Sequence, residues 1–149
     1  MAQQVANREE IRQSISLLLG IGQQEHFEDG MDNEFSQGLT SLIETYGEPA
    51  VEELADFVSS SQMNGELAAE SLVCVGRIED PATLIKRRSL LEASLSSSSH
   101  FIRDGALLGL SYLDDPHAIP HLKRAIERES STQLRRYMQQ VLREWEAAD

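Results

Sequence analysis

A short phrase built around proline occurs three times in this chain and constrains its fold more than any other feature. Its copies are Tyr46–Ala50, Ile78–Ala82 and Leu113–Ala118, and each closes one run of periodic apolar residues and opens the next. The prolines stand 32 and 35 residues apart, a spacing typical of repeated helical hairpins. Because such arrays are built to present a surface, the phrase predicts a scaffold and says little about chemistry.

Residues at matched distances before each proline predict the packed face of a helix, because steps of three, one and three residues follow the helical period. At three, six, seven and ten residues before proline stand Tyr46, Ile43, Leu42 and Leu39, then Ile78, Val75, Cys74 and Ser71, and finally Leu113, Leu110, Gly109 and Ala106. Glu48, Asp80 and Asp115 directly precede the prolines and are expected to cap the second helix of each hairpin.

The periodicity predicts an all-α chain of eight helices. We expect them at residues 7–20, 33–46, 49–60, 65–78, 82–96, 99–113, 116–129 and 131–146. Asn7 is expected to cap the first helix, and the acidic segment 22–32 is expected to be a mobile connector. A single domain over 1–149 would then comprise an N-terminal helix and acidic loop (1–32), three repeats (33–64, 65–98 and 99–130) and a capping helix (131–149).

The negative charge of the chain is concentrated in its N-terminal half. The formal net charge is −12, and residues 1–76 hold two basic and 14 acidic residues, whereas residues 77–149 hold 11 of each. Because neutralising phosphates requires clustered Lys and Arg, we expect neither nucleic acid nor an anionic membrane as a partner. A single cysteine, short apolar stretches and the lack of a signal-peptide pattern lead us to expect a cytoplasmic protein.

Residues Phe101–Leu122 carry the strongest copy of the repeat, with Arg103, then Ala and Leu at helical spacing, then the run Asp115–Pro120. This segment resembles a HEAT repeat, especially the short bacterial kind also found in phycobilisome-lyase-type proteins. The resemblance extends over 99–129 and 65–95 and weakens over 33–60. It implies a right-handed α-solenoid of about three HEAT-like hairpins whose second helices line a concave face, and it implies a binding scaffold rather than an activity. It also implies a structural role for Arg103, bonding helix-end carbonyls or a neighbouring capping Asp.

Lys86, Arg87 and Arg88 form the only run of three basic residues. They interrupt the apolar period of a predicted second helix, so we expect them to project into the concave groove as a positive pocket for a carboxylate, a phosphate or an acidic partner. The alternative is a solvated helix face that pairs with neighbouring acids. The groove contacts that we predict are Lys86, Arg87, Arg88, His117, His121 and Arg124, with Glu52, Glu53 and Asp56 at an acidic end.

The other reactive side chains predict no active site. His117 and His121 have the i, i+4 spacing of metal ligands, but no third ligand lies nearby in the sequence. Cys74 falls on the packed face, where a buried inert thiol is expected. The acidic segment 22–32 lacks the ligand ladder of an EF-hand loop, and no nucleophile, phosphate-binding or dinucleotide motif occurs. We therefore expect no enzyme, no metal and no cofactor.

These patterns favour a protein-interaction module, an adaptor or regulator that binds a protein partner through its concave face. One alternative, drawn from the resemblance, is a bilin-lyase-like subunit that handles a chromophore. Another is an acidic inhibitor or antitoxin-type neutraliser of a basic protein, whose binding would weaken steeply with salt.

Overall fold

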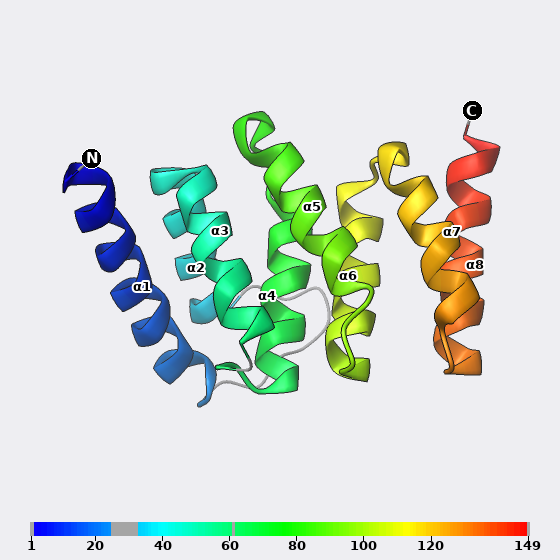
Figure 1. The fold of residues 1–149 in the computed structure, drawn as a ribbon, viewed down its shortest axis with the longest axis horizontal. Coiled ribbons are helices and arrows are strands. Elements are labelled where there is room, and N and C mark those ends of the chain that lie inside the picture. Colours follow the sequence, from blue (N-terminus) through cyan, green and yellow to red (C-terminus); the bar gives the residue numbers. More distant parts are fainter. Residues whose placement is uncertain (1, 25–32, 61, 149) are drawn as a thin grey trace.

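The chain folds into helices that stand side by side in a row, in chain order from one end to the other (Figure 1). This computed structural model describes residues 2–24, 33–60 and 62–148, and those residues contain no strand. Within them lie eight α-helices and two 3-10 turns: α1 (Ala2–Gly22), α2 (Glu34–Tyr46), α3 (Glu48–Ser59), α4 (Gly65–Arg77), η1 (Pro81–Thr83), α5 (Leu84–Ser94), α6 (His100–Leu113), η2 (Pro116–Ala118), α7 (Ile119–Arg128) and α8 (Thr132–Ala147).

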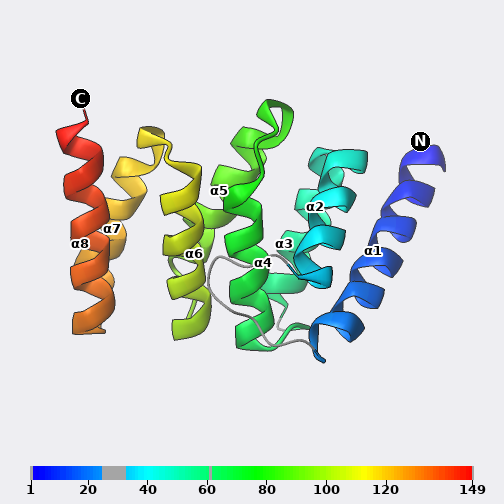
Figure 2. The same ribbon diagram turned by 180° about the vertical axis from the view of Figure 1, so that it is seen from behind.

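The helices form two layers. α3, α5 and α7 lie on one face of the row, and α2, α4, α6 and α8 lie on the other, as the views from opposite sides show (Figure 1 and Figure 2). α1 stands at the N-terminal end of the row and packs on both α2 and α3. The all-α prediction is confirmed. In the described part of the chain, no helix is both long and apolar enough to cross a membrane.

Seven of the eight predicted helices lie within a few residues of their expected bounds. The first is longer than predicted and runs from Ala2 to Gly22, so Asn7 lies inside α1 and the prediction that it caps this helix is wrong. No proline or glycine precedes Gly20 in this segment, and the helix therefore continues through Asn7 in both directions. The predicted acidic connector falls mostly on residues 25–32, which lie outside the described residues.

Acidic residues before proline cap two of the three hairpins as predicted. Asp80 accepts a hydrogen bond from the Ala82 N–H (3.1 Å), and Asp115 accepts one from the His117 N–H (3.1 Å). Each of these prolines opens a 3-10 turn, after which α5 and α7 begin. The prediction is wrong for Glu48, because α3 begins at Glu48 itself. The preceding glycine takes the cap position with a φ of 74°, a conformation that glycine adopts without strain.

The matched positions before each proline form the core between the layers. Ile43, Val75 and Leu110 are fully buried. Cys74 is buried as predicted, and its thiol donates to the carbonyl of Ser36 (3.4 Å). At the C-terminal end the predicted capping helix, α8, buries one apolar face against the array, formed by Leu134, Met138, Val141 and Trp145.

α4 and α6 pack with their backbones in contact. Gly105 and Gly109 of α6 face Ala69 and Leu72 of α4, and a β-carbon on Gly109 would lie only 2.6 Å from the carbonyl oxygen of Leu72. A β-carbon on Gly76 of α4 would overlap the carbonyl of Gly109. The helices approach this closely because glycine stands at the points where they cross. This contact fixes the second and third hairpins against each other.

Candidate functional site

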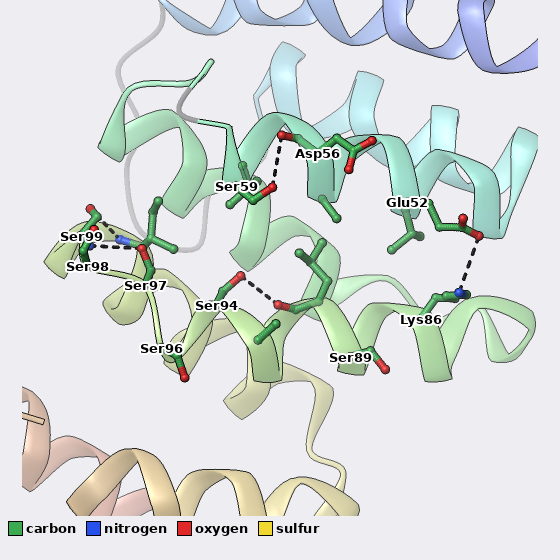
Figure 3. A pocket seen from close by; sticks show the side chains of 16 residues that line it. Glu52, Asp56, Ser59, Lys86, Ser89, Ser94, Ser96, Ser97, Ser98 and Ser99 are labelled. Atoms are coloured by element: carbon green, nitrogen blue, oxygen red, sulfur yellow. Dashed lines mark hydrogen bonds and ion pairs between the residues drawn. The ribbon is translucent and has the colours of Figure 1, made fainter. Parts of the chain in front are cut away.

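A groove runs between α3 and α5, on the face of the row formed by the second helix of each hairpin (Figure 3). Its volume is about 600 Å³, within the range of known binding sites. We name it the α3–α5 groove. One face of α3, within residues 51–59, and one face of α5, within residues 86–94, line the groove. The turn 96–99 and Ile102 of α6 complete the lining.

Small side chains leave open space between the two helices. Ala55 and Ser59 line the groove from α3, and Ser89 and Ala93 line it from α5. Each pair is separated by four residues, so its members lie one above the other on the same helix face. Larger buried apolar residues form the base, namely Val51, Val58 and Leu90. The groove therefore combines an apolar base with low, small-residue walls.

A salt bridge joins the two helices at one end of the groove. Glu52 Oε1 and Lys86 Nζ lie 3.6 Å apart, and the serine turn 96–99 lies at the opposite end (Figure 3). Both side chains are partly exposed, 39% for Glu52 and 44% for Lys86. An ion pair this exposed stabilises the fold by about 0–1 kcal/mol, so a ligand can displace it at little cost.

Two hydroxyl groups in the groove, those of Ser59 and Ser94, donate to backbone carbonyls of their own helices. Ser94 Oγ donates to the carbonyl of Leu90 (2.8 Å), and Ser59 Oγ donates to the carbonyl of Asp56 (3.4 Å) (Figure 3). A hydroxyl that donates inward keeps lone pairs that can accept a further hydrogen bond. Ser59 and Ser94 therefore offer oxygen acceptors to an occupant, whereas Ser97 and Ser99 accept the N–H groups of Ser99 and Ile102 and keep their O–H groups as donors at the other end of the groove.

Arg87 lies in the core and not in the groove, so its predicted role as a groove contact is wrong. It is 1% exposed, and its guanidinium donates to the carbonyls of Val75 (3.1 Å), Ile78 (2.6 Å) and Asp80 (2.7 Å) and to the hydroxyl of Thr83 (2.8 Å). These carbonyls lie at and just beyond the end of α4, where a helix leaves acceptors without partners. Burial lowers the pKa of Arg87, although a guanidinium stays charged in proteins.

Arg88 points toward the third hairpin. Its Nη1 lies 2.7 Å from Asp115 Oδ2, and its Nε lies 3.7 Å from Glu92 Oε2. Successive residues of an α-helix point about 100° apart, so the basic run is divided among the groove, the core and the neighbouring hairpin. Lys86 is the member of the run that lines the groove as a charged group, and the predicted positive pocket does not form there.

Two of the three predicted acids lie in the groove, and Glu53 does not. Glu53 is 2% exposed and faces α1, where its carboxylate accepts hydrogen bonds from Arg8 (3.2 Å) and Arg12 (2.6 Å). Burial raises the pKa of Glu53, but the hydrogen bonds from Arg12 and Arg8 outweigh this effect and hold the pKa below its usual range. Glu53 therefore attaches α1 to α3, while Glu52 and Asp56 remain at the groove.

Replacing Glu53 with Gln is expected to lower the free energy of unfolding at neutral pH by about 1–2 kcal/mol, because two partly exposed arginines lose their buried counter-ion. The pKa of Glu53 is lower in the folded state than in the unfolded state. Its contribution to stability is therefore present above the unfolded pKa of about 4.3 and is lost as the pH falls through the folded pKa.

Urea denaturation between about pH 7 and about pH 3 measures this dependence. The Glu53→Gln variant should lose stability less steeply with falling pH than the wild-type chain. Glu66→Gln, a change at an exposed residue of α4, is the matched control and should follow the wild-type curve. Identical slopes for Glu53→Gln and the wild type would show that this ion pair does not stabilise the folded state.

His117, His121 and Arg124 lie outside the α3–α5 groove. His117 Nδ1 is 2.8 Å from Asp115 Oδ1, and His121 Nδ1 is 3.1 Å from Glu92 Oε2, while Arg124 is exposed on α7. The structure thus places these predicted contacts on the side of the third hairpin and does not bring them together with Lys86. Among the described residues, no three His, Cys, Asp or Glu side chains are arranged to hold a metal ion.

The small residues that create the groove are absent from the sequence-based prediction. Ala55, Ser59, Ser89 and Ala93 carry no chemistry of their own, and only their i, i+4 pairing on two successive second helices could have revealed them. Ser99 of the serine run 96–99 caps α6, because its Oγ accepts the Ile102 N–H (3.4 Å), and the same run also closes the groove.

Arg103 holds the serine turn in place. Its Nη1 donates to the carbonyls of Ser97 (3.1 Å) and Ser98 (3.2 Å), and its Nε lies 2.9 Å from Glu129 Oε1. The expected structural role is therefore seen, with Glu129 as the acidic partner in place of a capping aspartate.

No protein-family model matches this chain, and neither does any curated protein or any solved structure. Function is therefore inferred from the geometry of the α3–α5 groove and not from similarity to known proteins. Membership of the HEAT repeats stays a prediction.

Proposed function

We propose that this chain is a non-enzymatic protein-interaction module, an adaptor or regulator that binds a peptide segment of a protein partner in the α3–α5 groove. The layered row of helices and the recurring proline phrase support a right-handed α-solenoid of HEAT-like hairpins, with the layer of α3, α5 and α7 as its concave face. The observation that carries the proposal is the groove of about 600 Å³ in this layer.

The side chains of the groove support binding rather than catalysis. Its lining contains no histidine or cysteine. The hydroxyls of Ser59 and Ser94 donate to backbone carbonyls, and the amine of Lys86 is paired with Glu52. Nucleophilic catalysis needs a nucleophile hydrogen-bonded to a base. None of the described residues in the lining forms such a pair.

The shape of the groove favours a chain segment over an enclosed ligand. The groove follows about two turns of α3 and about two turns of α5, and it opens to solvent. Small-molecule sites bury most of the surface of their ligand, whereas peptide segments are recognised in grooves between helices through regularly spaced apolar anchors.

Filling the groove is expected to abolish peptide binding. Ala93 is exposed and lines the groove, so Ala93→Trp places a large ring in the groove without disturbing the core. Ile85→Trp is the matched control, because Ile85 is 66% exposed on the same helix and lies outside the lining. Peptides selected from a random display library against the wild-type chain should bind Ala93→Trp at least about tenfold more weakly, and Ile85→Trp unchanged, by fluorescence anisotropy.

Circular dichroism and thermal unfolding of both variants check that the fold is kept. Peptides that bind Ala93→Trp as tightly as the wild-type chain would place the binding surface elsewhere on the molecule. A library that yields no binder for the wild-type chain would contradict the proposal that the chain binds peptide segments.

A further inference from the structure

The α3–α5 groove has the carboxylates of Glu52 and Asp56 on its α3 side, and two hydroxyls of its lining, Ser59 and Ser94, offer oxygen acceptors. We infer that its occupant is a basic segment, an amphipathic stretch of a partner protein that carries Lys or Arg on one side and apolar residues on the other. This inference rests on the proposed function, because it assigns the chemistry of the segment that binds in the same groove.

A row of carboxylates runs along α3 and reaches the groove at Glu52 and Asp56. Glu48, Glu52 and Asp56 stand four residues apart, so they lie on one face of the helix, one turn from each other. Glu48 is exposed, and the side chain of Asp56 is 68% exposed. An approaching segment therefore meets this row before it reaches the base of the groove.

The basic residues near this row are already engaged. Residues 1–76 contain only Arg8 and Arg12 as basic residues, and both bind the buried Glu53, at 3.2 Å and 2.6 Å. Arg12 reaches Asp56 only at 3.9 Å. Arg8 also binds Glu52 at 3.1 Å, and Lys86 lies 3.6 Å from the same carboxylate. Glu52 is therefore paired, and Asp56 is the carboxylate of the lining that keeps most of its negative charge for an occupant. The net charge of −12 strengthens the attraction for a basic segment at long range and disfavours a polyanion.

Two hydroxyls in the middle of the groove favour an occupant that carries hydrogen-bond donors. Ser59 and Ser94 donate to backbone carbonyls and present their oxygens as acceptors in the same lining as the carboxylate of Asp56. Lys and Arg carry three to five N–H donors and no acceptor. Their aliphatic stems also pack on apolar surface while the charged head stays at the polar border, and Ala55 and Leu90 provide apolar surface in the same lining as Asp56.

The test uses the library peptides that lose affinity for Ala93→Trp and are thus groove-dependent. These peptides should be enriched in Lys and Arg relative to the unselected library. Their Kd should rise at least about tenfold for Asp56→Lys and less than about twofold for Glu44→Lys, which makes the same change of charge on an exposed residue of α2 outside the groove. Their affinity for the wild-type chain should fall as NaCl rises from about 50 mM to about 500 mM.

Groove-dependent peptides that are acidic or uncharged would overturn the inference of a basic segment and leave the interaction module intact. Equal losses for Asp56→Lys and Glu44→Lys would also overturn it. Light scattering supplies a further check, since a dimer that dissociates on Ala93→Trp substitution would identify a second copy of the chain as the occupant. A complete absence of groove-dependent peptides would instead contradict the proposed function itself.

Discussion

Placing a β-carbon on Gly76 is expected to lower the free energy of unfolding by about 3 kcal/mol, because the Gly76→Ala methyl group would overlap the carbonyl of Gly109. The obstacle is backbone and not the flexible end of a side chain, so α4 and α6 must move apart to admit it. The separation would also loosen the neighbouring contact between Gly105 and Ala69. The higher helix propensity of alanine offsets only about 1 kcal/mol of this loss. Urea denaturation should therefore show a clear net decrease in the free energy of unfolding.

Gly20→Ala is the control for helix propensity alone. Gly20 lies within α1, and in the described part of the chain no atom beyond its own helical turns lies within 4 Å of the position that a β-carbon would take. This change is expected to leave the free energy of unfolding unchanged or to raise it by up to about 1 kcal/mol. A Gly76→Ala variant as stable as Gly20→Ala would show that α4 and α6 do not pack backbone to backbone in solution.

Replacing Arg87 with Met is expected to lower the free energy of unfolding by about 4 kcal/mol. Exchanging a buried ion pair for apolar residues is often harmless when both partners are removed. Here the acceptors are the backbone carbonyls of Val75, Ile78 and Asp80, and no substitution removes them. The carbonyls of Val75 and Ile78 would lose the donor that Arg87 supplies, whereas that of Asp80 keeps the Thr83 N–H (3.2 Å). Thermal and urea denaturation should both report the loss.

Two further variants separate the hydrogen bonds of Arg87 from the loss of a positive charge. Arg124→Met removes a charge from an exposed residue of α7 and should change stability by no more than about 0.5 kcal/mol. Arg87→Lys should fall between the two methionine variants, because a single ammonium cannot reproduce a guanidinium that reaches three carbonyls. If Arg87→Met proved as stable as Arg124→Met, the guanidinium would not be the group that completes the end of α4.

The helical fold could be predicted because its signals act over a few residues. Asp80 and Asp115 cap turns that begin at the very next residue, and the apolar period predicts which face of each helix is buried. The failures are local as well. No residue before Asn7 prevents helix formation, so α1 begins at Ala2 and not at Asn7. Gly47 takes the cap position that is predicted for Glu48.

The candidate site could be predicted only in part, because the direction of a charged side chain depends on partners far away in the chain. Arg88 is paired with Asp115, 27 residues later. Arg87 is drawn into the core by carbonyls at the end of α4, seven to twelve residues earlier in its own hairpin. Glu53 is buried because α1 brings Arg8 to it across 45 residues. A run of like charges therefore predicts that basic groups are present, but tertiary packing decides which of them meets solvent.

The two oxygens of Glu52 serve different helices. Oε2 accepts from Arg8 of α1 (3.1 Å), and Oε1 lies 3.6 Å from Lys86 of α5. One carboxylate on α3 therefore links the N-terminal helix to the far wall of the groove. By thermodynamic reciprocity, a change that weakens the hold of α1 on Glu52 alters the free energy of binding in the groove, and binding in the groove alters the local stability of α1 to the same extent. We therefore expect groove binding and the stability of α1 to change together when Glu52 is replaced.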